Sequence, residues 1–264
     1  MIGNFLIFGK EVSSYAVCAV IGALLTGTFA FIMSKKKGLD EVKMTFMLMF
    51  SVIGVFIGGH LLFGITNIDK MWLFGRIKNF NGFITVFSLI FGGQVFYGGL
   101  FGGIAVAIIF SRIVKLENFS GYTDIMAVGV PFFHFFGRIG CFMGGCCYGI
   151  ESDFGYTTHN GLIESANGVN RFPVQLFEAG FCLLLALFML KLLHSEKLKG
   201  KLFYIYLFIY AIGRFVLEFF RGDSYRGFLF GLSTSQIISV IIIILISLYF
   251  LFARKKQKNA QNCL

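Results

Sequence analysis

Apolar runs of about 20 residues recur along this chain and are separated by short polar segments. A transmembrane helix needs roughly 20 apolar residues, because the hydrocarbon core is about 30 Å thick and each residue rises about 1.5 Å. The runs predict helices near 12–33, 44–66, 83–113, 124–147, 173–194, 202–220 and 229–252. The pattern therefore predicts an all-α polytopic membrane protein of about seven transmembrane helices, with residues 1–264 as a single transmembrane domain.

The third run, 83–113, is long for one straight helix. Pairs of glycines interrupt it at positions 92–93, 98–99 and 102–103. Irregular backbone is tolerated at membrane depth only where protein buries it or where it lines a cavity. Part of this run is therefore expected to be unwound or re-entrant. The GxxxG-like spacing of the later glycines favours close helix packing over a phosphate cradle.

Composition and charge narrow the class of protein. The chain is 57% hydrophobic and only 14% charged, against roughly 25% charged residues in an ordinary soluble domain. The net charge of +10 comes from short basic clusters between apolar runs, at positions 35–37, 197–201 and 254–256. Cytoplasmic loops carry such clusters, and the count of Lys and Arg by loop predicts the N-terminus outside and the C-terminus in the cytoplasm. Binding to nucleic acid is therefore not expected.

Two arginines fall inside predicted helices, where each costs roughly 2.5–3.5 kcal/mol unless it has a partner or a wet cavity. One of them, Arg214, is four residues before Glu218, and Arg221 follows three residues later. Residues at these spacings share one helix face, and such a face could hold a charged lipid headgroup. The alternative is an Arg214–Glu218 ion pair that only neutralises itself. Arg138 and Arg221 argue against this alternative, because the sequence shows no carboxylate that would neutralise their positive charges.

The other intramembrane arginine, Arg138, lies between Gly137 and Gly140. Glycines leave room for a phosphate or a second backbone to come close, and a guanidinium donates two parallel hydrogen bonds to phosphate. The alternative is packing through small residues, with the arginine reaching up to the outer interface. The segment by itself leaves both interpretations open.

Three cysteines, Cys141, Cys146 and Cys147, follow Arg138 closely, and His134 precedes it. Zinc sites usually contain a CxxC pair, and this set lacks one, so a structural metal site is disfavoured. The vicinal pair Cys146–Cys147 could act as a redox or acyl-carrying thiol. Packing of small, soft side chains at a crowded helix interface is the favoured interpretation.

Four segments, taken in order, resemble the prolipoprotein diacylglyceryl transferase family. Residues 137–149, GRIGCFMGGCCYG, resemble the family pattern GRIGNFINGELYG. Residues 94–100 resemble its FHGGL stretch, 172–178 resemble HPxQLYE, and 213–221 resemble GRFxxEFFR. The likeness extends over about 12–252 and includes the seven-helix plan and its orientation.

This resemblance implies an enzyme of the bacterial inner, or plasma, membrane that spans it several times. It would transfer the diacylglyceryl group of phosphatidylglycerol to the lipobox cysteine of a preprolipoprotein and release glycerol phosphate. The substrates would be a membrane lipid and a lipobox peptide, and the chemistry needs no cofactor and no metal. The chain must stabilise a departing phosphate and accommodate a thiol nucleophile.

The resemblance also implies a role for individual residues. Arg138 would bind the headgroup phosphate, Arg214 would stabilise charge developing on it, and Glu218 would orient Arg214. Glu178 and Gln175 would shape the site from the next helix. The remaining positions that the resemblance assigns to the site are Gly137, Gly149, Arg221 and, as a catalytic group, Tyr97.

Three positions depart from the family patterns. Tyr97 replaces the histidine of FHGGL, Cys141 replaces an asparagine, and Cys146 replaces a glutamate. An unperturbed tyrosine, with a pKa near 10, is a poor general base at neutral pH. Tyr97 could relay the thiol proton transiently, or the departing phosphate could take it. Two alternatives follow: a divergent paralogue that uses the same lipid with another acceptor, and a non-catalytic lipid-binding or lipid-flipping protein.

Overall fold

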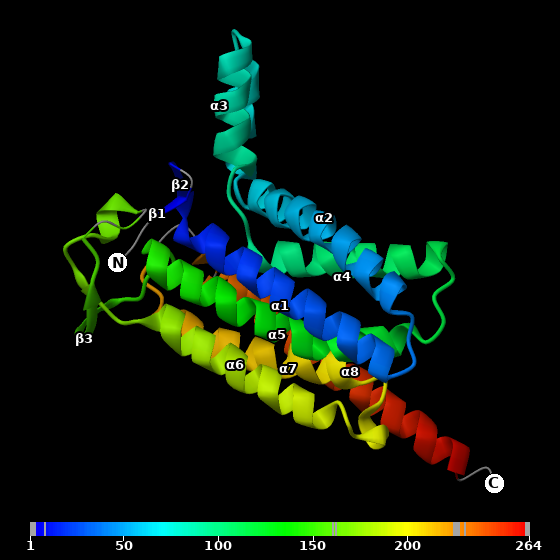
Figure 1. Ribbon diagram of the computed structural model, residues 1–264. Helices are drawn as coiled ribbons and strands as arrows, with labels where there is room; N and C mark the ends of the chain where they lie inside the picture. The colour runs from blue at the N-terminus through cyan, green and yellow to red at the C-terminus, as the bar shows by residue number, and fades with distance from the viewer. Residues whose placement is uncertain are drawn as a thin grey trace. The chain divides into compact units, whose positions relative to one another are not determined.

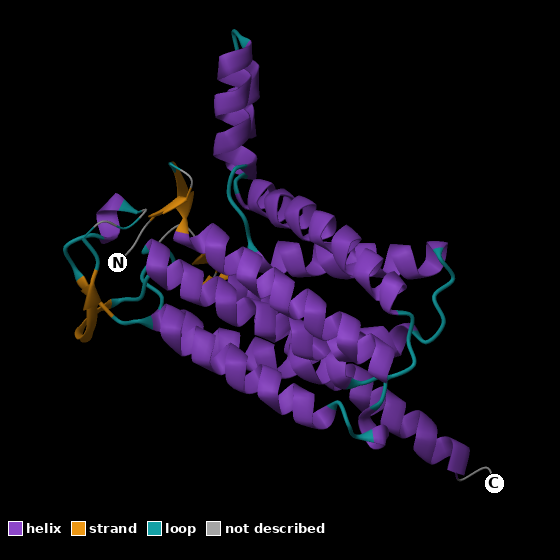
Figure 2. Ribbon diagram, in the orientation of Figure 1, coloured by secondary structure: helices purple, strands orange, loops and turns teal. Residues whose placement is uncertain are grey.

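A computed structural model describes residues 4–7, 9–159, 161, 163–223, 228–229 and 231–261. The helices in these residues are α1 Ser14–Lys36, α2 Glu41–Thr66, α3 Phe80–Phe91, α4 Phe96–Ile113, α5 Phe119–Gly144, α6 Val174–Leu192, α7 Leu202–Leu217 and α8 Thr234–Gln261. Short 3-10 helices cover Ile68–Arg76, Glu164–Ala166, Glu196–Leu198 and Glu218–Phe220. Helices thus dominate the fold, as Figure 1 and Figure 2 show.

Strands are few and short, and they form antiparallel two-stranded pairs. The first pair joins β1 Asn4–Ile7 to β2 Lys10–Ser13, with Asn4 opposite Ser13. The second joins β3 Glu151–Thr157 to β4 Asn170–Arg171, with an irregular register. The third joins β5 Phe228–Leu229 to β6 Leu232–Ser233. Each pair lies in a segment that connects or precedes helices, so none changes the all-α class.

Seven helices of the described residues are long and apolar enough to cross a membrane. They are α1, α2, α4, α5, α6, α8 and α7 with its extension to Phe220. Large apolar side chains stand exposed along them, including Leu24, Leu184 and Leu251, which are 66%, 69% and 61% exposed. Such surfaces suit hydrocarbon rather than water. The prediction of an all-α polytopic membrane protein is confirmed, whereas the orientation of the termini stays a prediction.

The long run 83–113 is not one helix. It divides into α3 and α4, and residues 92–95 between them are not helical. At 12 residues, α3 is about 18 Å long and too short to cross the hydrocarbon core. The expectation of an unwound stretch is therefore confirmed, and α4 alone supplies the crossing that was assigned to the whole run.

The chain forms two compact units, Met1–Met33 with Ser120–Leu264, and Ser34–Phe119. In the first unit α5 lies between α1 and α6 (Figure 1). Gly140 allows the approach of α1, because a β-carbon there would lie 3.0 Å from Cα of Tyr15. This contact supports the packing interpretation for Gly140. The assignment of residues 1–264 to a single domain stays a prediction.

In the unit Ser34–Phe119, α2 and α4 pack backbone against backbone through glycines. A β-carbon on Gly58 would meet the carbonyl oxygen of Gly98, and one on Gly102 would meet that of Gly54. Only residues without a side chain permit so close an approach. The prediction that Gly98 and Gly102 serve helix packing is confirmed.

Asp124 of α5 fixes the start of α7 in the larger unit. Its carboxylate is buried and accepts hydrogen bonds from the backbone N–H groups of Gly200, at 2.5 Å, and Leu202, at 3.0 Å. A carboxylate at this place satisfies helix-terminal N–H groups and complements the positive end of the helix dipole. It therefore acts as a cap supplied by another helix.

We expect Asp124→Ala to lower the stability of the protein by roughly 2–4 kcal/mol, because it removes two hydrogen bonds to a charged acceptor. Thermal unfolding of the purified protein in detergent measures the change. The exposed carboxylate Glu164 offers a control, since Glu164→Ala removes the same kind of group without a buried partner. Equal stability of the two variants would contradict the capping role.

Candidate functional site

The functional side chains come from three helices of the larger unit. Arg138 lies six residues before the end of α5, Glu178 lies four residues after the start of α6, and Arg214 lies three residues before the end of α7. At about 1.5 Å per residue, all three are roughly 5–9 Å inside the helix ends. The three side chains therefore lie near the same end of their helices.

Glu178 joins the two intramembrane arginines. Nη2 of Arg138 lies 3.0 Å from its Oε1, and Nη1 of Arg214 lies 3.1 Å from its Oε2. The side chains are nearly fully buried, with Glu178 only 1% exposed. A carboxylate between two guanidiniums holds both cations in place, since hydrogen bonds between charged groups are strong and directional. Arg138 therefore points at Glu178, and the interpretation in which it reaches up to the interface is wrong.

Arg214 also binds Glu218, as the four-residue spacing predicted. Its Nη2 lies 2.5 Å from Oε2 of Glu218 and donates to the hydroxyl of Ser235 on α8 at 3.4 Å. The ion pair is thus real, but it is not self-contained, because Glu178 occupies the other arm of the same guanidinium. These partners fix the plane of Arg214, which agrees with an orienting role for Glu218.

His134 is a site residue that sequence reasoning considered only as a metal ligand. Nε of Arg138 donates to Nε2 of His134 at 3.2 Å, and the imidazole lies beside the ring of Tyr210, with centroids 5.4 Å apart. An accepting Nε2 means that the imidazole is neutral and carries its proton on Nδ1. The spacing of four residues on α5 was the available signal, since it places His134 and Arg138 on one face.

The expectation for Arg221 is wrong in part. Helix α7 ends at Leu217, and a 3-10 turn follows, so Arg221 does not continue the face of Arg214. Its guanidinium instead binds Asp223 through two contacts of 2.9 and 2.6 Å. With Glu178 and Asp223 in place, the arginines are compensated by carboxylates. The excess positive charge inferred from the sequence is therefore absent among the described residues.

Gln175 links α6 to the segment after α5. Its amide Nε2 donates to the carbonyl oxygen of Cys146 at 2.9 Å and to the hydroxyl of Tyr156 at 2.7 Å. The side chain is fully buried, so these bonds are shielded from competing water. Gln175 therefore positions the loop that follows α5, which is one way of shaping a site.

The two glycines assigned to substrate binding differ in their surroundings. A β-carbon on Gly137 would meet nothing within 4 Å, so the space beside Gly137 itself is open. A β-carbon on Gly149 would meet the carbonyl oxygen of Phe172, and Gly149 pairs with Arg221 in an isolated β-bridge. Gly149 is thus required where backbone segments meet. Substrate contact by either glycine stays a prediction.

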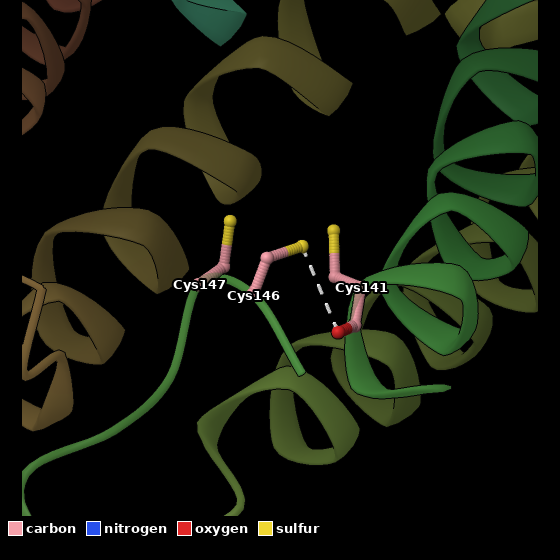
Figure 3. Close-up of side chains that lie close together, drawn as sticks. All are labelled: Cys141, Cys146 and Cys147. Atoms are coloured by element: carbon pink, nitrogen blue, oxygen red, sulfur yellow. Dashed lines mark hydrogen bonds between the residues drawn. The ribbon is translucent and has the colours of Figure 1, made fainter. Parts of the chain in front are cut away.

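The three cysteines gather at the end of α5, with Cys141 in its last turn and Cys146 and Cys147 just after it (Figure 3). Their sulfur atoms all lie within 4.8 Å of one another, and Cys141 is buried while the other two are half-buried. Hydrogen bonds with the Cys141 and Cys146 thiols, and then the guanidiniums of Arg221 and Arg138, lower the pKa of Cys147. The positive charges of Arg221 and Arg138 therefore stabilise the thiolate form of Cys147.

Tyr97 lies on α4, in the unit Ser34–Phe119. It is buried and stacks on Phe101, with ring centroids 6.1 Å apart, and its ring meets the edge of Phe96 at 5.7 Å. Its assignment as a catalytic residue stays a prediction.

The fold and the site together define a class of protein: a multi-pass membrane protein with a buried cluster of guanidiniums near the ends of its helices. Each guanidinium has five N–H donors, and the contacts of Arg138 with Glu178 and His134 engage only Nε and Nη2. The remaining donors of Arg138 suit a phosphate group. Such a protein is suited to chemistry on a phospholipid headgroup.

Comparison with known proteins specifies the family. The family model described as prolipoprotein diacylglyceryl transferase matches residues 4–252. Phosphatidylglycerol–prolipoprotein diacylglyceryl transferase 2 of Clostridium perfringens is 34% identical over 243 residues, which are 90% of each chain. Phosphatidylglycerol–prolipoprotein diacylglyceryl transferase of Campylobacter hominis is 33% identical to this chain. The match covers 98% of this chain and 91% of the relative. The chain belongs to the prolipoprotein diacylglyceryl transferase family.

Proposed function

We propose that this protein transfers the diacylglyceryl group of phosphatidylglycerol to the lipobox cysteine of preprolipoproteins. The acceptor sulfur attacks the glycerol carbon that carries the phosphate. A carbon–sulfur bond forms, the carbon–oxygen bond to phosphate breaks, and glycerol phosphate leaves with the electron pair. The thiol proton passes to the departing phosphate or to water, so the reaction needs no oxidant and no cofactor.

The observation that carries the proposal is the shared carboxylate of Glu178 between Arg138 and Arg214. Catalysis of this step requires donors that already point to where negative charge grows. Glu178 and Glu218 hold Arg214 from two sides, and His134 and Glu178 hold Arg138. Two guanidiniums fixed before the lipid arrives can therefore receive the phosphate without reorganisation.

The residues take three roles under this proposal. Arg138 binds the headgroup phosphate through donors that Glu178 and His134 do not engage. Arg214 stabilises the charge that grows as the carbon–oxygen bond breaks. Glu178, Glu218 and Gln175 act as positioning residues, because each contacts a guanidinium or a loop.

The location of the reaction follows from the orientation predicted by the positive-inside rule. With the N-terminus outside, the ends of α5 and α7 and the start of α6 lie at the outer face of the bacterial inner membrane. There the site would meet phosphatidylglycerol of the outer leaflet and lipobox peptides after their export.

The test is transfer of labelled diacylglycerol from phosphatidylglycerol to a lipobox peptide by the purified protein. We expect Arg138→Ala to lower the rate by roughly 100-fold or more, since a lost charge-stabilising donor typically costs that much. Arg112→Ala is the matched control, because Arg112 is an exposed arginine at the end of α4. Equal rates of Arg138→Ala and the control would overturn the assignment.

A second candidate is a relative that uses the same lipid with a different acceptor. Tyr97, Cys141 and Cys146, which depart from the family patterns, favour it. Release of glycerol phosphate by the purified protein, without labelling of the lipobox peptide, would support this candidate. Binding of phosphatidylglycerol with no release of glycerol phosphate would instead support a lipid-binding or lipid-flipping role.

A further inference from the structure

No step of the proposed transfer uses the cluster of Cys141, Cys146 and Cys147. We propose that these three thiols bind a thiophilic metal ion of the Zn²⁺ class, as thiolates, with one coordination position left to an outside ligand. The inference concerns binding of the ion alone and does not depend on transferase activity.

The end of α5 explains why two of the sulfurs meet. The N–H of Cys146 donates to the carbonyl of Cys141 at 3.1 Å, and that of Gly145 donates to Phe142 at 3.3 Å. Together with the positive φ of 69° at Gly145, these bonds form a Schellman motif, which brings the residue after the glycine back over the last helical turn. Cys146 is therefore placed against Cys141 although five residues separate them.

Cys147 completes the group through an unfavourable backbone conformation. Its φ is 55°, in the left-handed region that costs a residue with a β-carbon roughly 1–2 kcal/mol. The bond from Gln175 to the carbonyl of Cys146 holds the adjoining peptide in place. Strained residues of this kind gather at binding sites, where surrounding contacts enforce them.

The geometry of the sulfurs suits a metal ion. Three thiolates at about 2.3 Å from one ion lie roughly 4 Å apart, and the three sulfurs here are all within 4.8 Å of one another. Closure by less than about 1 Å therefore brings them to the spacing of zinc ligands. Cys146 and Cys147 lie on the loop that leaves α5 (Figure 3), and because both are half-buried an ion can reach them.

The ligand set also decides which ions fit. Soft thiolates select zinc and similar thiophilic ions over magnesium or calcium. No histidine or carboxylate joins the three cysteines in the part of the chain that the structure describes. Three protein ligands with an open fourth position are typical of zinc sites that exchange an outside ligand, rather than of closed structural sites.

The experiment is titration of the full-length protein, in detergent with a non-thiol reductant, with Co²⁺ as a coloured probe and Zn²⁺ as competitor. We expect about one equivalent of Co²⁺ to bind, with sulfur-to-cobalt charge-transfer absorption of the strength given by three thiolates and with displacement by Zn²⁺. Absence of this absorption, or an intensity that fits fewer than three thiolates, would overturn the proposal. This readout uses the unmodified protein and is independent of how any variant folds.

Cys147→Ser supplies the second readout. Mutation of a residue that only hydrogen-bonds to a metal ligand lowers metal affinity roughly 10–100-fold. Removal of the ligand itself is therefore expected to lower the affinity for Co²⁺ at least tenfold. Cys182→Ser is the matched control, because Cys182 is a buried thiol on α6 outside the trio, and it should bind Co²⁺ as the unmodified protein does. Unchanged affinity of Cys147→Ser would contradict the site.

Discussion

Replacement of Glu178 by alanine is expected to abolish diacylglyceryl transfer and to destabilise the protein by roughly 3–5 kcal/mol. Removal of one partner from a buried ion pair leaves the other charge uncompensated, and Glu178 is the shared partner of Arg138 and Arg214. No second carboxylate binds Arg138 among the described residues, so its guanidinium would lose its only anionic contact. Thermal unfolding and the transfer assay, measured on the same preparation, check both effects.

Two further variants separate charge from shape at this position. Glu178→Gln keeps the volume but not the charge, so it should retain more stability than Glu178→Ala and still lose transfer. Glu164→Ala removes an exposed carboxylate and is expected to change neither quantity. Wild-type transfer by Glu178→Ala would show that the two arginines need no shared carboxylate, and the site as described would then be wrong.

Arg214→Ala is expected to lower the rate of transfer by roughly 100- to 1,000-fold, the usual cost of a donor that stabilises charge in the transition state. Binding of phosphatidylglycerol should change much less, because Arg138 would still contact the phosphate. Rates at saturating lipid, together with lipid binding measured separately, distinguish the two roles.

Arg214→Lys tests whether the planar fork of this residue matters. The guanidinium contacts Glu178 through Nη1 and Glu218 through Nη2, and a single ammonium cannot reproduce both contacts. We therefore expect Arg214→Lys to remain well below the unmodified enzyme, although its charge is kept. A lysine variant with full activity would show that charge alone suffices, and the orienting role of the carboxylates would be refuted.

Local patterns in the sequence predict much of the site. The four-residue spacing of Arg214 and Glu218 predicts their ion pair, since helical geometry alone brings such residues together. The ordered motifs around Arg138 and Glu178 indicate the family. Sequence reasoning fails where a helix ends unexpectedly: Arg221 lies beyond α7 and binds Asp223, because helix ends depend on contacts that no periodicity reports.

The cysteines carry a signal that spacing rules miss. The absence of a CxxC pair argues against a metal site, yet the Gly144–Gly145 pair at the end of α5 is typical of a C-terminal cap. That cap reverses the chain and places Cys146 on Cys141. Spacing rules for metal sites were drawn from other turns, such as the one in a CxxC pair. They therefore do not predict that a helix cap brings Cys146 against Cys141.

The sequence by itself determined the membrane class, the number of crossings and the family, because hydrocarbon thickness and motif order act directly on the linear chain. It also determined which residues carry charge inside the membrane. Only the tertiary structure decided which side chains meet: Glu178 lies between Arg138 and Arg214, His134 accepts from Arg138, and the three thiols form one cluster. The contacts of Glu178 join different helices. The thiol cluster depends on the turn that follows α5, and the contact of His134 with Arg138 depends on the direction of both side chains. Helix packing and caps, rather than local spacing, set their geometry.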